Sequence, residues 1–372
     1  MPNVTLSLGK NSYDVHVSNG SLDSVGFFAA RARLGKRAAL ITDAHVYPQY
    51  GESVRRSLEA ADVEVSVHVI TAGEEQKSLS QVEKLVSEMV AAGHNRSSFV
   101  VALGGGVVGD LAGFVASVFY RGIPYVQLPT SVLAQVDSSI GGKTAVNIPA
   151  GKNLIGAFHQ PRFVLADPIS LLTLSPRDLR EGMAEMVKHA AIRKPKMLVT
   201  LRHIAKEVPL GFSLRTIESL PEVIAENIEI KARIVEEDEH ETSGVRAFLN
   251  FGHTLGHGIE ASLPYGQLRH GEAVSLGMRA ALFLSRKHLG LQAQEEREVL
   301  ETLAALQQPL VLPEEVDPAD VMEHTAADKK FDHGKIRFVL LRALGDPVLS
   351  TEITREDLQE AIAHLTTPVS LN

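Results

Sequence analysis

The stretch FVVALGGGVVGDLAGFVASVF, residues 99–119, decides the fold. It opens with an apolar run typical of a buried strand, continues with three glycines, and ends in an apolar helical pattern. Gly104, Gly106 and Gly109 satisfy G-x-G-x-x-G in this strand–loop–helix context. Such glycines let backbone N–H groups and a helix N-terminus approach a pyrophosphate. The stretch therefore predicts a dinucleotide-binding unit, with a tight turn that binds no ligand as the alternative.

The glycine pattern lacks one expected part. Dinucleotide-binding domains place an acidic residue about 20 positions downstream, where it binds the ribose. Residues 125–136 contain no Asp or Glu. Asp43, at the end of an earlier apolar run, could supply that carboxylate from another strand.

The pattern of expected helices and strands changes along the chain. Before residue 160, strand-like runs such as 63–70 alternate with helical patterns such as 78–93, which is typical of a parallel, doubly wound sheet. After residue 170 amphipathic helical patterns dominate, with a strand or hairpin pattern at 335–349. We expect an α/β nucleotide-binding domain over residues 1–165 and a mainly α-helical domain over residues 166–372. Clefts at such domain junctions are common ligand sites.

Composition excludes several classes of function. The 372 residues carry 37 Lys and Arg against 45 Asp and Glu, a net charge of −8, which argues against a nucleic-acid partner. There are no cysteines, so any metal must be bound by His, Asp or Glu. No apolar run is long enough to span a membrane, and the N-terminus does not resemble a signal peptide. We therefore expect a cytoplasmic protein without a membrane partner.

Three histidines make the segment NFGHTLGHGIEASLPYGQLRHGEAV, residues 250–274, a candidate metal site. The four-residue spacing of His253 and His257 puts both on one face of a helix, and spacing alone favours this pair as joint ligands. His270 follows, and the absence of H-E-x-x-H removes the metalloprotease interpretation. Glu185 could complete a zinc triad, although read alone it resembles half of a surface ion pair with Lys188.

A second group of polar residues lies in the segment 127–161. Asp137, Lys143, Lys152 and Asn153 occur there among small residues, where cationic groups could reach a phosphate or a carboxylate. A solvated loop is the alternative. Lys231 stands on an otherwise apolar helical stripe, where it either extends along the apolar surface or faces a ligand.

Several blocks of this chain, in family order, closely resemble 3-dehydroquinate synthases. They are ALGGGVVGDLAGFVA, YRGI, LPTSVLAQVDSSIGGKTAVN, GKNLIGAFHQP, REGMAEMVKH, RAFLNFGHTLGHGIE, RHGEAV and DKK. The resemblance implies a Rossmann-like N-terminal domain, a mainly α-helical C-terminal domain, bound NAD, one Zn2+ or Co2+ ion, and a homodimer. The implied reaction converts 3-deoxy-D-arabino-heptulosonate 7-phosphate, a phosphorylated sugar acid, to 3-dehydroquinate and phosphate. It proceeds through transient oxidation by NAD, loss of phosphate, return of the hydride and ring closure.

The resemblance also assigns residues. It gives the metal ligands as Glu185, His253 and His270, and makes His257 a catalytic-site residue. The implied substrate and catalytic residues are Arg121, Asp137, Lys143, Lys152, Asn153, Lys188, Lys231, Arg246, Asn250, His257 and Lys330. The implied NAD-binding residues are Asp43, Glu74, Lys77, Gly105, Gly106, Val107, Val108, Gly109, Asp110, Thr130, Ser131, Lys143, Lys152 and Thr173.

Two alternatives share parts of this pattern. A sister sugar-phosphate cyclase, of the 2-epi-5-epi-valiolone synthase type, would alter the run around Lys143, which here keeps the dehydroquinate synthase form. An NAD-dependent polyol dehydrogenase would not need the phosphate-binding lysines. The segment DEHETSGVRA before Arg246 is one residue longer than is usual in the family, which puts the conformation of that loop in question.

Overall fold

The computed structural model describes residues 2–264, 266–327, 331–332 and 335–370. The chain divides into two compact units that are each built from two segments of sequence. Unit 1 comprises Met1–Leu174 and Phe212–Glu236, and unit 2 comprises Ser175–Gly211 and Glu237–Asn372. The division thus falls nine residues after the expected boundary at residue 165, and the segment Phe212–Glu236 groups with the N-terminal part.

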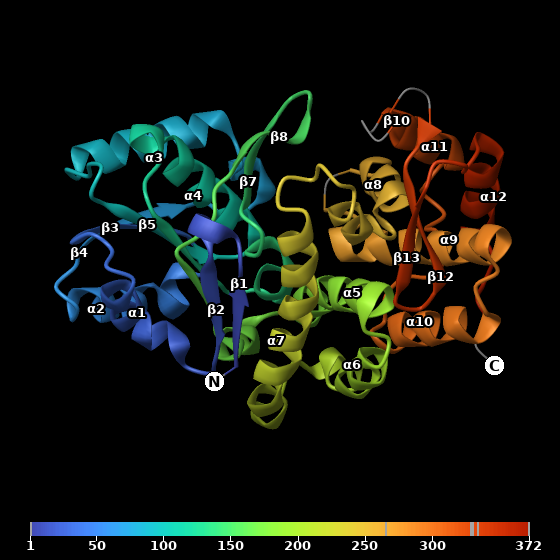
Figure 1. Cartoon of the computed structure of the whole chain (residues 1–372), viewed down its shortest axis with the longest axis horizontal. Coiled ribbons are helices and arrows are strands. Elements are labelled where there is room, and N and C mark those ends of the chain that lie inside the picture. The colour runs from blue at the N-terminus through green and yellow to red at the C-terminus, as the bar shows by residue number, and fades with distance from the viewer. Residues whose placement is uncertain (1, 265, 328–330, 333–334, 371–372) are drawn as a thin grey trace. The chain divides into compact units, whose positions relative to one another are not determined.

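Unit 1 is built on one seven-stranded sheet (Figure 1). Its strands, in spatial order, are β1 (Asn3–Leu6), β2 (Tyr13–Val17), β9 (Phe163–Ala166), β6 (Tyr125–Pro129), β5 (Phe99–Gly104), β3 (Arg37–Asp43) and β4 (Glu64–Ile70). Only the β1–β2 pair is antiparallel among these neighbours. The α/β fold expected for the N-terminal part is confirmed.

Helices cover both faces of this sheet, which explains the continuous apolar character of its central strands. The helices of unit 1 are α1 (Val25–Arg31), α2 (Glu52–Glu59), α3 (Leu79–Ala91), α4 (Gly106–Val118) and α7 (Leu214–Glu237, of which Glu237 falls in unit 2). Alternate β5 residues point to opposite faces: Val100 packs in the core that includes α3 and α4, and Val101 in the core that includes α1 and α2. Figure 1 shows these helix pairs on opposite sides of the sheet.

The polar segment after β6 forms regular structure. Strands β7 (Lys143–Ile148) and β8 (Gly151–Phe158) make an antiparallel hairpin outside the main sheet. Small residues permit this pairing, because a side chain on Gly156 would lie 2.3 Å from the Thr144 carbonyl oxygen. The solvated loop considered from the sequence is therefore replaced by a two-stranded ribbon.

Unit 2 is mainly helical, as expected. Its helices are α5 (Pro176–Arg193), α6 (Met197–Ala205), α8 (His253–Ala261), α9 (His270–Leu289), α10 (Ala293–Ala305), α11 (Pro318–Ala327) and α12 (Arg355–Leu365). Its short strands are β10 (Phe331–Asp332), β11 (Lys335–Ile336), β12 (Phe338–Ala343) and β13 (Asp346–Ser350), and β12 pairs with β13 as the expected hairpin. Helix α9 is largely buried as far as Ser285, and α5, α8, α10, α12 and β12 pack on it.

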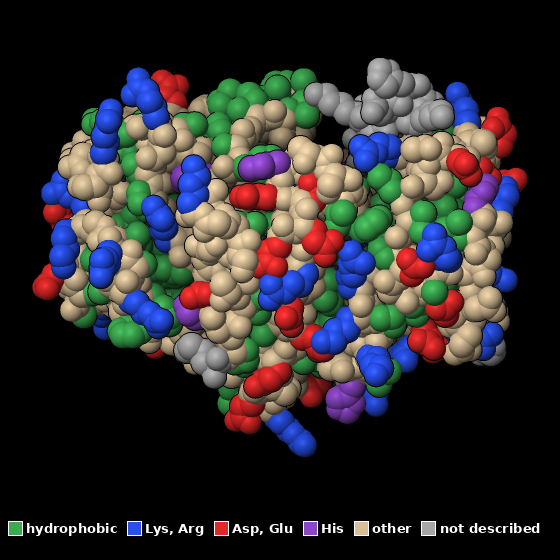
Figure 2. All heavy atoms as spheres, viewed as in Figure 1, with side chains coloured by type: hydrophobic (Ala, Val, Ile, Leu, Met, Phe, Trp, Pro, Cys, Tyr) green, Lys and Arg blue, Asp and Glu red, His purple; other side chains and the backbone are tan. Residues whose placement is uncertain are grey.

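The surface of the molecule carries charges of both signs. On the face drawn in Figure 2, Lys and Arg side chains are interspersed with Asp and Glu side chains. Across the described residues, no helix combines the length and apolar character needed to cross a bilayer.

Helices α8 and α9 approach each other closely because glycines line their contact. An ideal Cβ on Gly277 would lie 1.8 Å from the Gly252 carbonyl oxygen and 2.8 Å from the Gly256 backbone nitrogen. Both obstacles are backbone atoms, so no side-chain rotation can relieve the clash. This contact fixes the spacing of the helices that begin at His253 and His270.

We expect Gly277→Ala to lower the free energy of unfolding by roughly 2 kcal/mol, because α8 and α9 must separate to admit the methyl group. The clash outweighs the better helix propensity of alanine, which is worth about 1 kcal/mol. Urea unfolding followed by circular dichroism measures the change. A variant as stable as the parent would show that the helices separate without cost.

A buried histidine pair lies beside the edge strand β4. The Ser66 hydroxyl oxygen is 2.8 Å from His68 Nε2 and 2.6 Å from His94 Nε2, and His68 Nδ1 is 3.1 Å from a Glu88 oxygen. Burial, with smaller contributions from His68 and Arg37, lowers the pKa of His94 to about 4. Between pH 6.5 and pH 4 the unfolded chain therefore binds a proton that the folded chain excludes, so stability falls as the pH decreases through that window.

Replacing His94 by Gln removes this titration and keeps a polar atom near Ser66. Between pH 7 and pH 5 we expect the parent to lose more free energy of unfolding than His94→Gln, by on the order of 1 kcal/mol. Denaturant titrations of both proteins at the two pH values give this difference. Parallel losses would show that His94 does not contribute to the acid sensitivity.

Candidate nucleotide and metal sites

The glycine loop lies where the sequence placed it. Strand β5 ends at Gly104, and α4 begins at Gly106 with Gly105 as its N-cap. Among the described side chains none caps this helix, so its first N–H groups are available to an anion. A Cβ added to Gly105 would have the Ser131 hydroxyl oxygen as its nearest neighbour, at 3.6 Å, so a ligand can approach the backbone there.

The carboxyl ends of three adjacent strands bring the expected nucleotide residues to one edge of the sheet. Asp43 ends β3, and Thr130 and Ser131 follow β6 on the other side of the loop. Strand β4 lies on one side of β3 and β5 on the other, so the order of strands reverses beside Asp43. Parallel sheets bind ligands at such a reversal. The structure thus places Asp43 at the same sheet edge as the glycine loop. This position suits the ribose-binding carboxylate that the sequence lacks downstream of the loop.

Lys77 is the centre of a buried polar network at this edge. Its ammonium group donates to Asp110 Oδ2 at 2.8 Å and to Asn153 Oδ1 at 2.7 Å, and lies 3.5 Å from Glu74 Oε1. Burial acts to lower the pKa of Lys77, but the carboxylates of Asp110 and Glu74 outweigh it and raise the pKa, so the ammonium stays charged. Lys77 therefore contacts two other expected NAD residues and one expected catalytic residue.

The other expected substrate and catalytic residues of unit 1 fall into two groups. Lys231 on α7 donates to the backbone oxygen of Asp137 at 2.6 Å and forms an ion pair with its carboxylate. Arg121, Lys143 and Lys152 are exposed. Arg121 and Asn153 both adopt left-handed backbone conformations, with φ of 71° and 57°. Such conformations are costly for non-glycine residues and concentrate at functional sites.

Thr173 lies at the end of the 3₁₀ helix Pro168–Thr173, where its hydroxyl is 3.0 Å from the hydroxyl of Tyr50. Tyr50 was not among the residues that the sequence singled out. Tyr50 and Thr173 are 123 positions apart in the sequence, so no local pattern identifies the pair.

Three side chains of unit 2 form a group that could hold a metal ion. Glu185 on α5 is fully buried, and its Oε1 is 3.4 Å from Nε2 of His253 and 3.4 Å from Nε2 of His270. These atoms, one from each residue, all lie within 4.8 Å of one another. The structure therefore brings together the three residues that the family resemblance implies, and the group does not include His257, the partner that helical spacing suggested for His253.

The donor set fits a zinc or cobalt ion. Tetrahedral zinc holds its ligand atoms at 2.0–2.1 Å, which places neighbouring ligands roughly 3.4 Å apart. Both histidine–glutamate separations match that value. A carboxylate with two imidazoles is also the usual composition of a catalytic zinc site that keeps a coordination position open.

Electrostatics around Glu185 favour the charged carboxylate. Burial opposes ionisation, yet Lys188, His253 and His270 together hold the pKa of Glu185 well below its ordinary value. Lys188 is also buried and forms an ion pair with Glu185 Oε2. Burial lowers the pKa of His253, so this ring is neutral and has a lone pair available for a metal.

Other expected residues of unit 2 surround this group or lie on the preceding loop. The ring of His257 is 5.3 Å from that of His253 and 5.9 Å from that of His270. Arg246 and Asn250 begin and end a 3₁₀ helix, and the Arg246 guanidinium donates to the Glu239 carbonyl oxygen at 2.6 Å. Lys330 lies outside the described residues.

The loop before Arg246 is ordered by one carboxylate. Asp238 accepts backbone N–H groups from Thr242, Ser243, Gly244 and Arg246 at 2.7–3.1 Å. Burial opposes ionisation, but these donors hold the pKa of Asp238 below its ordinary value. The loop that leads to Arg246 therefore forms a compact turn around Asp238.

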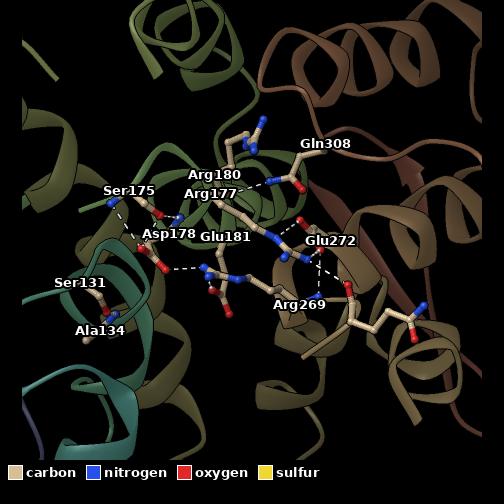
Figure 3. A network of polar contacts seen from close by, with 11 residues as sticks. Ser131, Ala134, Ser175, Arg177, Asp178, Arg180, Glu181, Arg269, Glu272 and Gln308 are labelled. Carbon is tan, nitrogen blue, oxygen red and sulfur yellow. Dashed lines mark hydrogen bonds and ion pairs between the residues drawn. The ribbon is translucent and has the colours of Figure 1, made fainter. Parts of the chain in front are cut away.

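A polar network that the sequence did not reveal ties the helices carrying Glu185 and His270 together (Figure 3). Arg177 on α5 makes a bidentate ion pair with Glu272 on α9, at 2.9 and 2.8 Å. Arg269 forms an ion pair with Asp178 and lies 3.3 Å from Glu181. The only local signal is Glu272 three residues after Arg269, whose backbone N–H it accepts at 2.9 Å.

Comparisons with known proteins agree along the chain. Residues 67–181 match the family model described as 3-dehydroquinate synthase N-terminal, and residues 182–331 match the one described as 3-dehydroquinate synthase C-terminal. A 3-dehydroquinate synthase of Symbiobacterium thermophilum is 45% identical over 359 residues, covering 95% of this chain and 98% of that protein.

Solved structures extend the comparison to sugar-phosphate cyclases. A 2-deoxy-scyllo-inosose synthase complexed with carbaglucose-6-phosphate, NAD+ and Co2+ has a TM-score of 0.88 at 26% identity, covering 97% of this chain and 99% of that one. A 2-epi-5-epi-valiolone synthase from Streptomyces hygroscopicus subsp. jinggangensis, with NAD+ and Zn2+ bound, has a TM-score of 0.85 at 31% identity, covering 96% and 98%.

The ligand assignment predicts which histidine variants lose the metal. We expect His253→Ala and His270→Ala each to weaken Zn2+ binding by at least about 100-fold, because each removes a ligand atom. His257→Ala is the matched control and keeps the affinity of the parent within a few-fold. Chelator competition measures the three constants. A loss confined to His253→Ala and His257→Ala would instead support the ligand pair suggested by spacing.

Proposed function

Because the chain belongs to the 3-dehydroquinate synthase family, we infer that it is an enzyme that converts 3-deoxy-D-arabino-heptulosonate 7-phosphate to 3-dehydroquinate and phosphate. This carbon–oxygen lyase reaction belongs to the shikimate pathway, which leads to chorismate and the aromatic amino acids. The observation that carries the inference is the assembled Glu185–His253–His270 group in a chain 45% identical to a 3-dehydroquinate synthase.

We propose NAD and one zinc or cobalt ion as the cofactors. Two cyclases of the same fold were solved with NAD+ and with Co2+ or Zn2+, and the residues of this chain suit both groups. When bound, these groups supply a reversible hydride acceptor and Lewis-acid polarisation of the substrate oxygens. Glu185, His253 and His270 would hold the metal.

In unit 1 the chain's own residues would bind the nucleotide. The N–H groups at the start of α4 would receive the pyrophosphate. Asp43 would accept a ribose hydroxyl, and the charged Lys77 would hold Glu74 and Asp110 in position beside the nucleotide. The full proposed set remains Asp43, Glu74, Lys77, Gly105, Gly106, Val107, Val108, Gly109, Asp110, Thr130, Ser131, Lys143, Lys152 and Thr173.

Cationic and amide side chains would bind the anionic substrate. In unit 1, Arg121, Lys152 and Asn153 are assigned to the phosphate, Lys231 to the carboxylate and hydroxyl groups, and Asp137 and Lys143 to the surroundings of the nicotinamide and the substrate. In unit 2, His257 and Lys330 are assigned to the phosphate, and Lys188, Arg246 and Asn250 to the carboxylate and hydroxyl groups. Buried Lys188 suits this task because a desolvated ammonium interacts strongly with an anion.

Assembly and location rest on the family alone. We propose that the enzyme is a homodimer of the cytoplasm. Light scattering on the purified protein should give twice the 40.2 kDa of one chain.

The rival activities are weaker for specific reasons. The valiolone-type cyclase is 31% identical to this chain and the inosose-type cyclase 26%, against 45% for a 3-dehydroquinate synthase. A polyol dehydrogenase has no use for a phosphate-binding set that includes Lys152 and Asn153.

A turnover experiment tests the proposal. Zinc-loaded protein, NAD below the enzyme concentration, and 3-deoxy-D-arabino-heptulosonate 7-phosphate are mixed, and phosphate release and NADH absorbance are followed. We expect many phosphates per NAD and no lasting NADH, because the net reaction eliminates phosphate without net oxidation. His270→Ala, as the control, should release at least about 100-fold less, in line with its lost metal.

Each rival predicts a different result. Turnover of sedoheptulose 7-phosphate alone would assign the chain to the sister cyclases. NADH formed one for one with a polyol would assign it to the dehydrogenases.

A further inference from the structure

His270 lies between two carboxylates. Its Nε2 is 3.4 Å from Glu185 Oε1, and its Nδ1 is 3.1 Å from Glu260 Oε2. Glu260 is the penultimate residue of α8, the helix that begins at His253. The two ring nitrogens of His270 therefore have different partners, and one of those partners is not a metal ligand.

The two histidines of the metal group share this arrangement. Nδ1 of His253 is 3.2 Å from the backbone oxygen of Phe251, so each ring has an oxygen acceptor at Nδ1 and points Nε2 at Glu185. A neutral imidazole carries one N–H, and an acceptor at Nδ1 places the proton there and leaves the Nε2 lone pair for a metal. A backbone carbonyl holds the ring of His253, and a removable side chain holds that of His270.

We infer that Glu260 is a positioning residue for the metal: its carboxylate fixes the orientation and tautomer of His270 and thereby strengthens metal binding. The inference rests on the proposed function in that Glu185, His253 and His270 hold the ion. Glu260 would act through His270 and would not touch the metal.

The local geometry of α8 supports this role. His253, His257 and Glu260 occupy positions i, i+4 and i+7, which share one face of a helix. The Glu260 side chain is 19% exposed, so its interaction with His270 is only partly screened by water. Glu181, a third carboxylate near His270, lies 3.3 Å from Arg269, which partly neutralises it.

Metal affinity of the full-length protein tests the inference without reference to activity. With Zn2+ alone and a chromophoric chelator as competitor, Glu260→Ala should bind zinc about 10- to 100-fold more weakly than the parent. Glu323→Ala, which removes an exposed carboxylate from α11 of the same unit, is the matched control and should match the parent. Zinc affinity of Glu260→Ala within twofold of the parent would overturn the inference.

A double-mutant cycle separates positioning from simple charge. If Glu260 acts through His270, adding Glu260→Ala to His270→Ala should change the Zn2+ constant by less than twofold. An equal loss in both backgrounds would mean that Glu260 acts only as a nearby charge and would overturn the positioning role. Should Glu260→Ala fold poorly, Glu260→Gln can replace it in the cycle, because its amide oxygen still accepts from Nδ1–H; a few-fold loss that depends on His270 is then expected.

The Co2+-loaded protein gives a second readout. Tilting of His270 in Glu260→Ala should change the visible d–d absorption of bound cobalt, and Glu323→Ala should leave it unchanged. A parent that binds neither metal would refute the proposed cofactor, whereas a parent that binds zinc tightly alongside an unaffected Glu260→Ala would refute only the positioning role.

Discussion

The charge of Glu185 is the constraint on which the metal-binding unit depends. A carboxylate with no exposure to water is costly to ionise unless cations surround it. Helix α5 supplies Lys188 one turn away, and α8 and α9 each supply a histidine as their first residue. The glycine contact between α8 and α9 then fixes the distance between those histidines. The burial of Glu185 thus explains why a lysine and two histidines from three helices surround it.

In unit 1, the order of the strands determines where the expected nucleotide-binding residues lie. The reversal of strand order beside β3 brings Asp43, the glycine loop and the β6 terminus to one edge of the sheet. Backbone N–H groups at the N-terminus of α4 are available to bind an anion there. The Lys77 side chain adds charge balance at this edge, because its ammonium group lies beside the carboxylates of Asp110 and Glu74.

Local patterns in the sequence were sufficient for much of this structure. The central strands and the glycine loop were predictable because apolar runs and glycine spacing act over a few residues, and the hairpin β12–β13 was indicated by its apolar run. The β7–β8 hairpin was not predicted, since its strands are rich in small and polar residues. The placement of Phe212–Glu236 in unit 1 was also not predicted, because the sequence of an amphipathic helix does not show which surface it packs against.

For the candidate metal group, helical spacing and the family resemblance led to different sets of residues. Helical spacing suggested His253 with His257, whereas the fold places Glu185 and His253 beside His270, which lies at the start of another helix. Pairs such as Arg177 with Glu272, 95 positions apart, and Lys231 with Asp137, 94 apart, leave no periodic signal. Glu260 is intermediate: its position on the face of His253 and His257 can be read from the sequence, but its contact with His270 cannot.

The path of the chain has a consequence for how the protein can be divided. Because unit 1 is completed by Phe212–Glu236, the backbone passes between the units three times. Asn19 donates to the Ile217 carbonyl oxygen and the Ser7 N–H to Glu236, so the late segment is tied to the first strands and the turn that follows them. A gene fragment that stops at residue 174 would encode an N-terminal unit without α7. Because each unit consists of two segments of sequence, neither can be exchanged or duplicated as one continuous stretch of the gene.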